Sequence, residues 1–138
     1  MSARSKARKR ALDILFEADS KSIPIASVLA DTVRRREASK EPALNPHTVA
    51  LVEGVVAHQA AIDAAIEAVA EGWSLARMPA VDRAILRIGT YEVLFLGDVP
   101  TGVAISEAVD LASSLSTDES PAFVNGVLSG VARSGAQA

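Results

Sequence analysis

The sequence has no cysteine and few aromatic residues, and both shortages narrow what the protein can be. Its 138 residues include three Phe, one Tyr and one Trp. Without cysteine there is no disulfide framework, no thiolate zinc site and no cysteine nucleophile. Aromatic residues make up 4% of a chain that is 49% hydrophobic, so the core must be built mainly from Ala, Val, Leu and Ile. That composition favours helices over sheets.

Long hydrophobic runs are also missing. No uninterrupted apolar run approaches the roughly 20 residues needed to cross a bilayer. The amino terminus leads into basic residues and has no apolar segment of the signal-peptide type. We therefore expect a cytoplasmic protein with no membrane partner. A chain of this length is one ordinary domain, here residues 1–138, and is long enough to bury a core unaided.

Residues suited to catalysis are scarce. His47 and His58 are eleven positions apart, and no third ligand completes a metal site at that spacing. The glycines are scattered rather than gathered in a phosphate-binding loop, and no serine lies in a nucleophile elbow. We expect no enzymatic activity, no catalytic residues, no metal and no other cofactor.

Helical periodicity accounts for nearly the whole chain, with breaks at proline and glycine. Asn45-Pro46 and Ser120-Pro121 each offer a capping residue followed by proline, which is a helix start. The helix after Asn45 is expected to bend near His58. The pattern predicts six or seven helices packed as a bundle, over approximate ranges 6–19, 25–38, 46–72, 79–96, 103–115 and 121–133, with a short connector at 73–78 and a frayed tail at 134–138.

The helix over residues 79–96 is predicted to be central, because it is apolar around most of its circumference. Glu92 nevertheless projects into its apolar arc. An unpaired carboxylate buried there would cost several kcal/mol. A shifted general acid or base is one reading, but no second catalytic group is placed beside it. We favour a structural carboxylate that ties two helices together, for example by accepting backbone N–H groups at a neighbouring helix start.

The formal net charge of −3 conceals a strong asymmetry. Five of the 14 basic residues precede the first acid, Asp13, so the remaining chain holds nine basic and 17 acidic residues and a net charge of −8. The five lie in a basic arm over residues 1–10: Arg4, Lys6, Arg8, Lys9 and Arg10. An acidic body with a basic arm indicates a polyanionic partner at one end.

Helical spacing divides these five cations into two groups. Lys9 and Arg10 have Asp13 four and three residues further on, so both have a local partner. Arg4, Lys6 and Arg8 have none, and we expect them to be available to phosphate groups. A solvated, disordered basic tail is the alternative interpretation.

Single-stranded RNA is favoured as the polyanion if a base can stack beside the arm, because stacking on an aromatic ring contributes about 1–3 kcal/mol. Phe16 and Phe123 are the candidates, since each lies at the edge of its helix's apolar arc. Simple core packing is the alternative for both.

Three stretches together resemble the NusB family. The first is ARKRALDILFEA at residues 7–18, which is similar to the opening arginine-rich helix of that family. The second is VDRAILRIGTYE at residues 81–92. The third runs from residues 99 to 128 and contains VP, VAISEAV, LA and FVNGVL in the family's order. The second and third stretches are specific and cover most of residues 78–131, whereas residues 20–77 match only in helical character.

This resemblance implies an all-α fold of about seven helices in two sub-bundles. It also implies a transcription antitermination factor that binds the boxA element of ribosomal RNA transcripts. The ribosomal protein NusE would bind alongside, within the complex that lets RNA polymerase pass terminators.

Residue by residue, the resemblance places Arg4, Lys6 and Arg8 on arm positions associated with RNA. Phe16 and Phe123 match aromatic positions near the RNA surface. Two acidic residues, Asp82 and Glu119, match positions on the NusE-facing and RNA-facing side. An acidic body also suits a basic ribosomal protein through charge complementarity.

Other readings stay open at this point. NusB-like domains also occur at the amino end of ribosomal RNA cytosine methyltransferases, and a free-standing chain of 138 residues argues against that assignment. A plain helical interaction module with an idle basic arm is a third reading. The sequence also leaves open a monomer or a homodimer that hides its RNA face.

Overall fold

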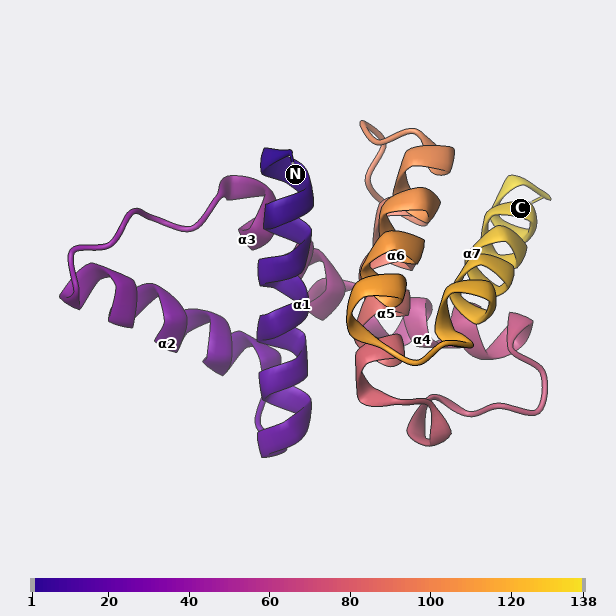
Figure 1. Cartoon of the computed structure of the whole chain (residues 1–138), viewed down its shortest axis with the longest axis horizontal. Coiled ribbons are helices and arrows are strands. Elements are labelled where there is room, and N and C mark those ends of the chain that lie inside the picture. Colours follow the sequence, from indigo (N-terminus) through magenta and orange to yellow (C-terminus); the bar gives the residue numbers. More distant parts are fainter. Residues whose placement is uncertain (1, 138) are drawn as a thin grey trace.

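A computed structural model describes residues 2–137, with side chains described as far as residue 135. Within this range the chain forms seven α-helices and one short 3-10 turn (Figure 1). The helices are α1 (Ala3–Lys21), α2 (Ile25–Ala38), α3 (Pro46–Ala57), α4 (Gln59–Val69), α5 (Ala80–Leu94), α6 (Thr101–Leu115) and α7 (Ser120–Gln137), and the 3-10 turn η1 (Leu75–Arg77) precedes α5.

Most of these boundaries follow from the local sequence. The bounds of α2 match the expected range, and the Asn45 side chain caps α3 by accepting the His47 N–H at 2.8 Å, with Pro46 in the first helical position. The segment expected to be frayed, 134–138, is helical as far as Gln137, and Ala138 lies outside the described residues.

The first helix begins earlier than the periodicity predicted. Helix α1 starts at Ala3 because the Ser2 hydroxyl accepts the Ser5 N–H at 3.0 Å and caps it. The predicted basic arm, of which Met1 lies outside the described residues, is therefore the first two turns of a helix. Its cations point in fixed directions around α1.

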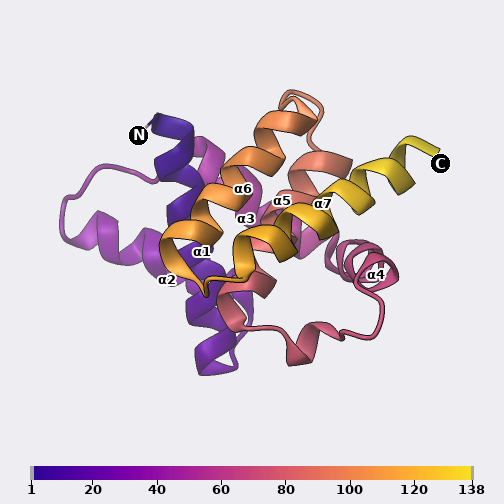
Figure 2. The ribbon, with the colours of Figure 1, turned by 45° about the vertical axis from the view of Figure 1, so that its right-hand side comes forward.

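Two sub-bundles meet at α5, as the family resemblance implied. Helices α1, α2 and α3 pack together on one side, while α4, α6 and α7 surround α5 on the other (Figures 1 and 2). Helix α5 contacts α1, α3, α4, α6 and α7. The prediction that this helix is central is confirmed.

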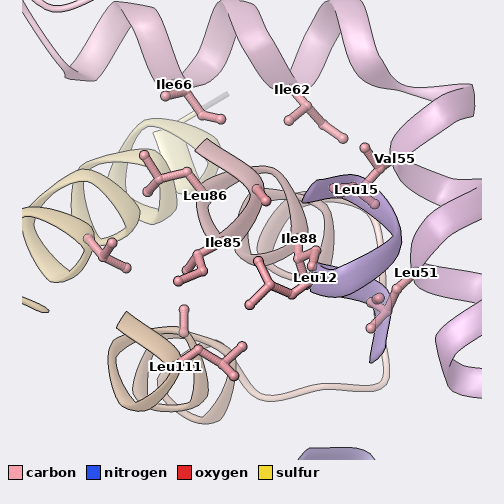
Figure 3. Close-up of a cluster of buried hydrophobic side chains, with 14 of the residues drawn as sticks. Leu12, Leu15, Leu51, Val55, Ile62, Ile66, Ile85, Leu86, Ile88 and Leu111 are labelled. Carbon is pink, nitrogen blue, oxygen red and sulfur yellow. The ribbon is translucent and has the colours of Figure 1, made fainter. Parts of the chain in front are cut away.

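The core is aliphatic, as the shortage of aromatic residues required. Leucine, isoleucine and valine side chains from both sub-bundles meet around α5 (Figure 3). In the close-up, Ile85, Leu86 and Ile88 of α5 lie between side chains of α1, α3, α4 and α6. One continuous core therefore holds the two sub-bundles together.

A bend near His58 divides the long apolar helix that was expected over residues 46–72. Helices α3 and α4 meet there at 79°. Among the described residues, no single helix is long and apolar enough to cross a membrane, and only this bent pair reaches the length and composition together.

Candidate nucleic-acid interface

The N-terminal turns of α1 carry the cations that the sequence singled out. These cations differ in how exposed they are and in whether each forms an ion pair. Arg4 is exposed over 48% of its side chain, but its Nη2 lies 3.1 Å from Oδ2 of Asp98. The prediction that Arg4 lacks an intramolecular partner is therefore wrong. The pair is exposed, and such pairs contribute only about 0–1 kcal/mol, so a phosphate can compete for Arg4 at low cost.

Arg8 departs furthest from expectation. Arg8 is only 3% exposed. It donates two hydrogen bonds to Glu92 of α5, from Nε to Oε1 at 2.7 Å and from Nη2 to Oε2 at 2.9 Å. Glu107 of α6 lies 3.6 Å from Nη1. The hydrogen bond that Arg8 donates to Glu92 raises the pKa of Arg8, against the lowering effect of burial. Arg8 is therefore not free to bind a phosphate.

The same contact explains Glu92. The prediction that this carboxylate ties two helices together is confirmed, because it joins α5 to α1. Its partner is the Arg8 guanidinium and not a row of backbone N–H groups at a helix start. Both residues carried a signal in the sequence: Glu92 interrupts an apolar arc, and Arg8 continues the apolar line of α1. Nothing in the sequence indicated that these two residues, 84 positions apart, contact each other.

Lys6 and Arg10 are the cations of α1 that have no ion pair among the described residues. Lys9 pairs with Asp13 at 2.7 Å, as predicted. The expected pairing of Arg10 with Asp13 is wrong, because Lys9 uses both oxygens of that carboxylate. Both Lys6 and Arg10 are exposed, and they leave α1 with two uncompensated positive charges on one flank.

Phe123 of α7 lies half-buried at the edge of a hollow of about 360 Å³. Trp73, which is 53% exposed, lines the same hollow, and its ring centroid lies 6.3 Å from that of Phe123 at an angle of 57°. Phe123 also packs against the hydrophobic core, so part of its ring is covered, whereas the exposed Trp73 ring can accept a stacked nucleobase. Phe16 is half-buried on α1. Helical periodicity had pointed to Phe123, at the edge of an apolar arc, but not to Trp73, whose position in a connector gave no periodic signal.

Asp82 and Glu119 both line this hollow. Asp82 is buried and accepts hydrogen bonds from the hydroxyls of Ser116 and Ser120, the latter at 2.9 Å. Its carboxylate therefore joins the start of α5 to the turn between α6 and α7. Glu119 is exposed on that turn. Of the two predicted partner contacts, only Glu119 presents an exposed charge.

The two histidines lie apart. The His58 ring stacks on Phe95 with centroids 4.1 Å apart, whereas His47 Nε2 is buried with no hydrogen-bond partner among the described residues. Burial lowers the pKa of His47, and the cations Arg4 and Arg8 add to that effect while Glu92 and Asp98 oppose it. No group of three metal-binding side chains occurs within the part of the chain that the structure describes.

An all-helical fold with a cationic flank on its first helix and an open aromatic hollow defines a small helical binding protein. Comparison with known proteins identifies the family to which the chain belongs. A family model described as the NusB family matches residues 5–133, and the chain belongs to this family.

The similarity is close in both sequence and fold. The chain is 59% identical over 128 residues to the transcription antitermination protein NusB of Arthrobacter sp. (strain FB24), which covers 93% of this chain and 91% of that protein. It superposes on T. maritima NusB with a TM-score of 0.81 at 30% identity, covering 96% of this chain and 92% of that one. A crystal structure of antitermination factors NusB and NusE in complex with double-stranded RNA gives a TM-score of 0.79 at 27% identity, covering 95% and 96%.

Proposed function

We propose that this protein is a transcription antitermination factor that binds the boxA element of ribosomal RNA transcripts together with NusE, as part of the complex that keeps RNA polymerase processive. It acts in the cytoplasm as a binding adaptor, without catalytic turnover. The observation that carries this proposal is the 59% identity, across nearly the full length of both chains, to a transcription antitermination protein.

The N-terminal half of α1 is the proposed electrostatic contact. Lys6 supplies an uncompensated charge, and Arg4 supplies one that is held only by an exposed ion pair with Asp98. Arg8 takes a different role from the one expected. Its buried bond to Glu92 fixes α1 against α5, so it positions the other cations instead of contacting RNA.

Base stacking is the second proposed contribution. The exposed ring of Trp73 and the half-buried ring of Phe123 lie at one end of α7, and Phe16 lies half-buried on α1. Each stacked base would add about 1–3 kcal/mol, whatever its identity. The exposed Glu119 beside these rings suits a basic partner, which is the chemistry expected of NusE, a ribosomal protein.

The direct test is a fluorescence anisotropy titration of single-stranded boxA RNA with and without NusE, and with a scrambled RNA of equal length. The proposal predicts preferential binding of boxA and tighter binding when NusE is present. Equal binding of boxA and scrambled RNA, unaffected by NusE, would contradict it. Sedimentation of the free protein tells a monomer from a homodimer that covers the same face.

The substitutions must respect the buried pair. A triple change of Arg4, Lys6 and Arg8 to Ala would confuse loss of binding with loss of stability, because Arg8 is a core contact. Lys6→Gln with Arg4→Gln removes two exposed charges and leaves Arg8 in place. At about −0.7 per phosphate contact, the slope of log affinity against log salt should become less negative by about 1.4.

A further inference from the structure

A hollow of about 240 Å³ opens between α1, α2 and α3, on the flank of α1 opposite the one on which Ser5 and Lys9 face α6. We call it the cationic hollow. None of the described residues that line it is acidic, and its polar lining consists of three cations and two neutral side chains: Lys6, Arg10, Arg36, Asn45 and Thr48. In a chain whose residues after the first ten carry a net charge of −8, a concave site lined by positive charge alone is unusual.

None of the three cations has an ion pair among the described residues. Arg36 is held in place by its own backbone neighbourhood, because its Nε donates to the carbonyl oxygen of Pro42 at 2.8 Å. Its two terminal nitrogens have no acceptor in the described part of the chain. A guanidinium that is positioned but unpaired favours a phosphate oxygen as its partner.

Carboxylates do lie nearby, in a second hollow that shares Arg10 and Arg36. Two of its three acids are already engaged, since Asp13 pairs with Lys9 and Glu17 pairs with Lys21. Glu41, the third, has no ion pair to either arginine. The protein's own acids therefore leave the positive charge of the cationic hollow uncompensated on the side that faces α3.

The position of the hollow points to RNA as the source of the anion. Lys6 belongs both to the hollow and to the proposed RNA contact on α1, so the two surfaces are continuous. Lys6 and Arg10 are four residues apart on one helix, about 6 Å along its axis. Two cations in line along a helix suit a chain of successive phosphates better than a single small ion.

We propose that the cationic hollow is a second RNA subsite, in which Lys6, Arg10 and Arg36 bind the phosphodiester backbone of a segment flanking boxA. This inference rests on the proposed function, because the flanking segment is brought there by the bound boxA element. The RNA would cross α1. The boxA element would lie on the side of α1 that carries Phe16, and the backbone of the adjoining RNA segment would lie on the opposite side. The hollow contributes affinity and length dependence without base specificity.

The test compares a short boxA RNA with the same RNA extended at its 5′ end or its 3′ end. The protein variants are Arg10→Gln with Arg36→Gln, Arg36→Lys, and Arg133→Gln. Arg133 is a matched control, because it is an exposed arginine without an ion pair among the described residues and lies on α7, on the far side of the molecule from α2 (Figure 1). Arg36→Lys keeps the charge and loses the fixed guanidinium.

Wild type should bind one of the extended RNAs more tightly than the short RNA, and the double variant should lose that gain. With two contacts at about −0.7 each, raising salt fourfold weakens wild-type binding to the extended RNA about sevenfold more than it weakens the double variant. Arg133→Gln should behave as wild type, and Arg36→Lys should fall between wild type and the double variant.

Two results would overturn the inference while leaving the proposed function intact. One is boxA-specific binding by wild type with no difference between short and extended RNA in any variant. The other is that inorganic phosphate, at matched ionic strength, protects the backbone amides around the cationic hollow from hydrogen exchange, while the slope of log RNA affinity against log salt is the same in wild type and the double variant. That result would assign the hollow to a free anion. Failure of wild type to bind boxA at all would instead remove the proposed function.

Discussion

Removing Glu92 while keeping Arg8 is the sharpest test of how this fold is held together. In Glu92→Met a side chain of similar length replaces the carboxylate, and the buried Arg8 guanidinium loses both of its short hydrogen bonds. Breaking one side of a buried ion pair typically costs about 3–5 kcal/mol. Glu107 at 3.6 Å still offsets part of the charge, so we expect the lower end, about 3 kcal/mol.

This loss is large against a typical total stability of about 5–15 kcal/mol. At an unfolding entropy of about 2.1 cal/mol/K per residue, 138 residues give about 0.29 kcal/mol/K, so the melting temperature should fall by about 10 °C. Thermal and urea unfolding followed by circular dichroism measure both quantities.

The double variant Arg8→Met with Glu92→Met is the matched control. Replacing both partners of a buried ion pair by apolar side chains is often neutral or stabilising, so the double variant should lie within about 1 kcal/mol of wild type or above it. A Glu92→Met variant as stable as wild type, or a double variant as unstable as the single one, would show that the buried Arg8–Glu92 pair does not stabilise the fold as described.

Three further predictions concern local contacts. Gly54→Ala should lower the free energy of unfolding by about 1–3 kcal/mol in urea titrations, because a Cβ there would lie 2.1 Å from the Tyr91 ring. Gly126→Ala is the control, because a Cβ there meets open space, and it should raise the free energy of unfolding by about 0.5–1 kcal/mol. Ser120→Ala should cost about 1–3 kcal/mol in the same assay, since buried Asp82 loses a hydrogen-bond donor, and an unchanged midpoint would contradict that role. The pKa of His47 is lower in the folded protein, so the unfolded chain binds the proton more readily and stability should fall as pH drops below about 6.5. His47→Gln should flatten this pH dependence in melting curves recorded from about pH 7.5 to about pH 5. An unaltered profile would show that His47 is not its cause.

The sequence predicted the fold well because the relevant signals are local. Periodic aliphatic residues, the Asn45-Pro46 start and the Ser120-Pro121 start define helices without any knowledge of tertiary contacts. The central place of α5 followed from its apolar circumference. The largest errors lie at the two ends of the chain: α1 begins three residues earlier than predicted, because the capping residue Ser2 precedes the apolar pattern, and α7 continues to Gln137 through the segment expected to be frayed.

The site was harder to predict because it depends on contacts between distant segments. Arg8 and Glu92 are 84 positions apart and Arg4 and Asp98 are 94 apart, so neither pair leaves a trace in helical spacing. Local spacing also misassigned Arg10, whose expected partner Asp13 is taken by Lys9. Arg36 was not singled out at all, because its position beside α1 depends on how α2 packs.

Which face of the protein the RNA touches is the central question, and backbone amide chemical shifts of the 15N-labelled protein answer it most directly. On addition of boxA RNA, we expect the largest shift changes in the first three turns of α1 and at the start of α7, and little change in α4. Shift changes centred on α4, or tight binding that leaves α1 unperturbed, would show that α1 is not part of the RNA-binding face.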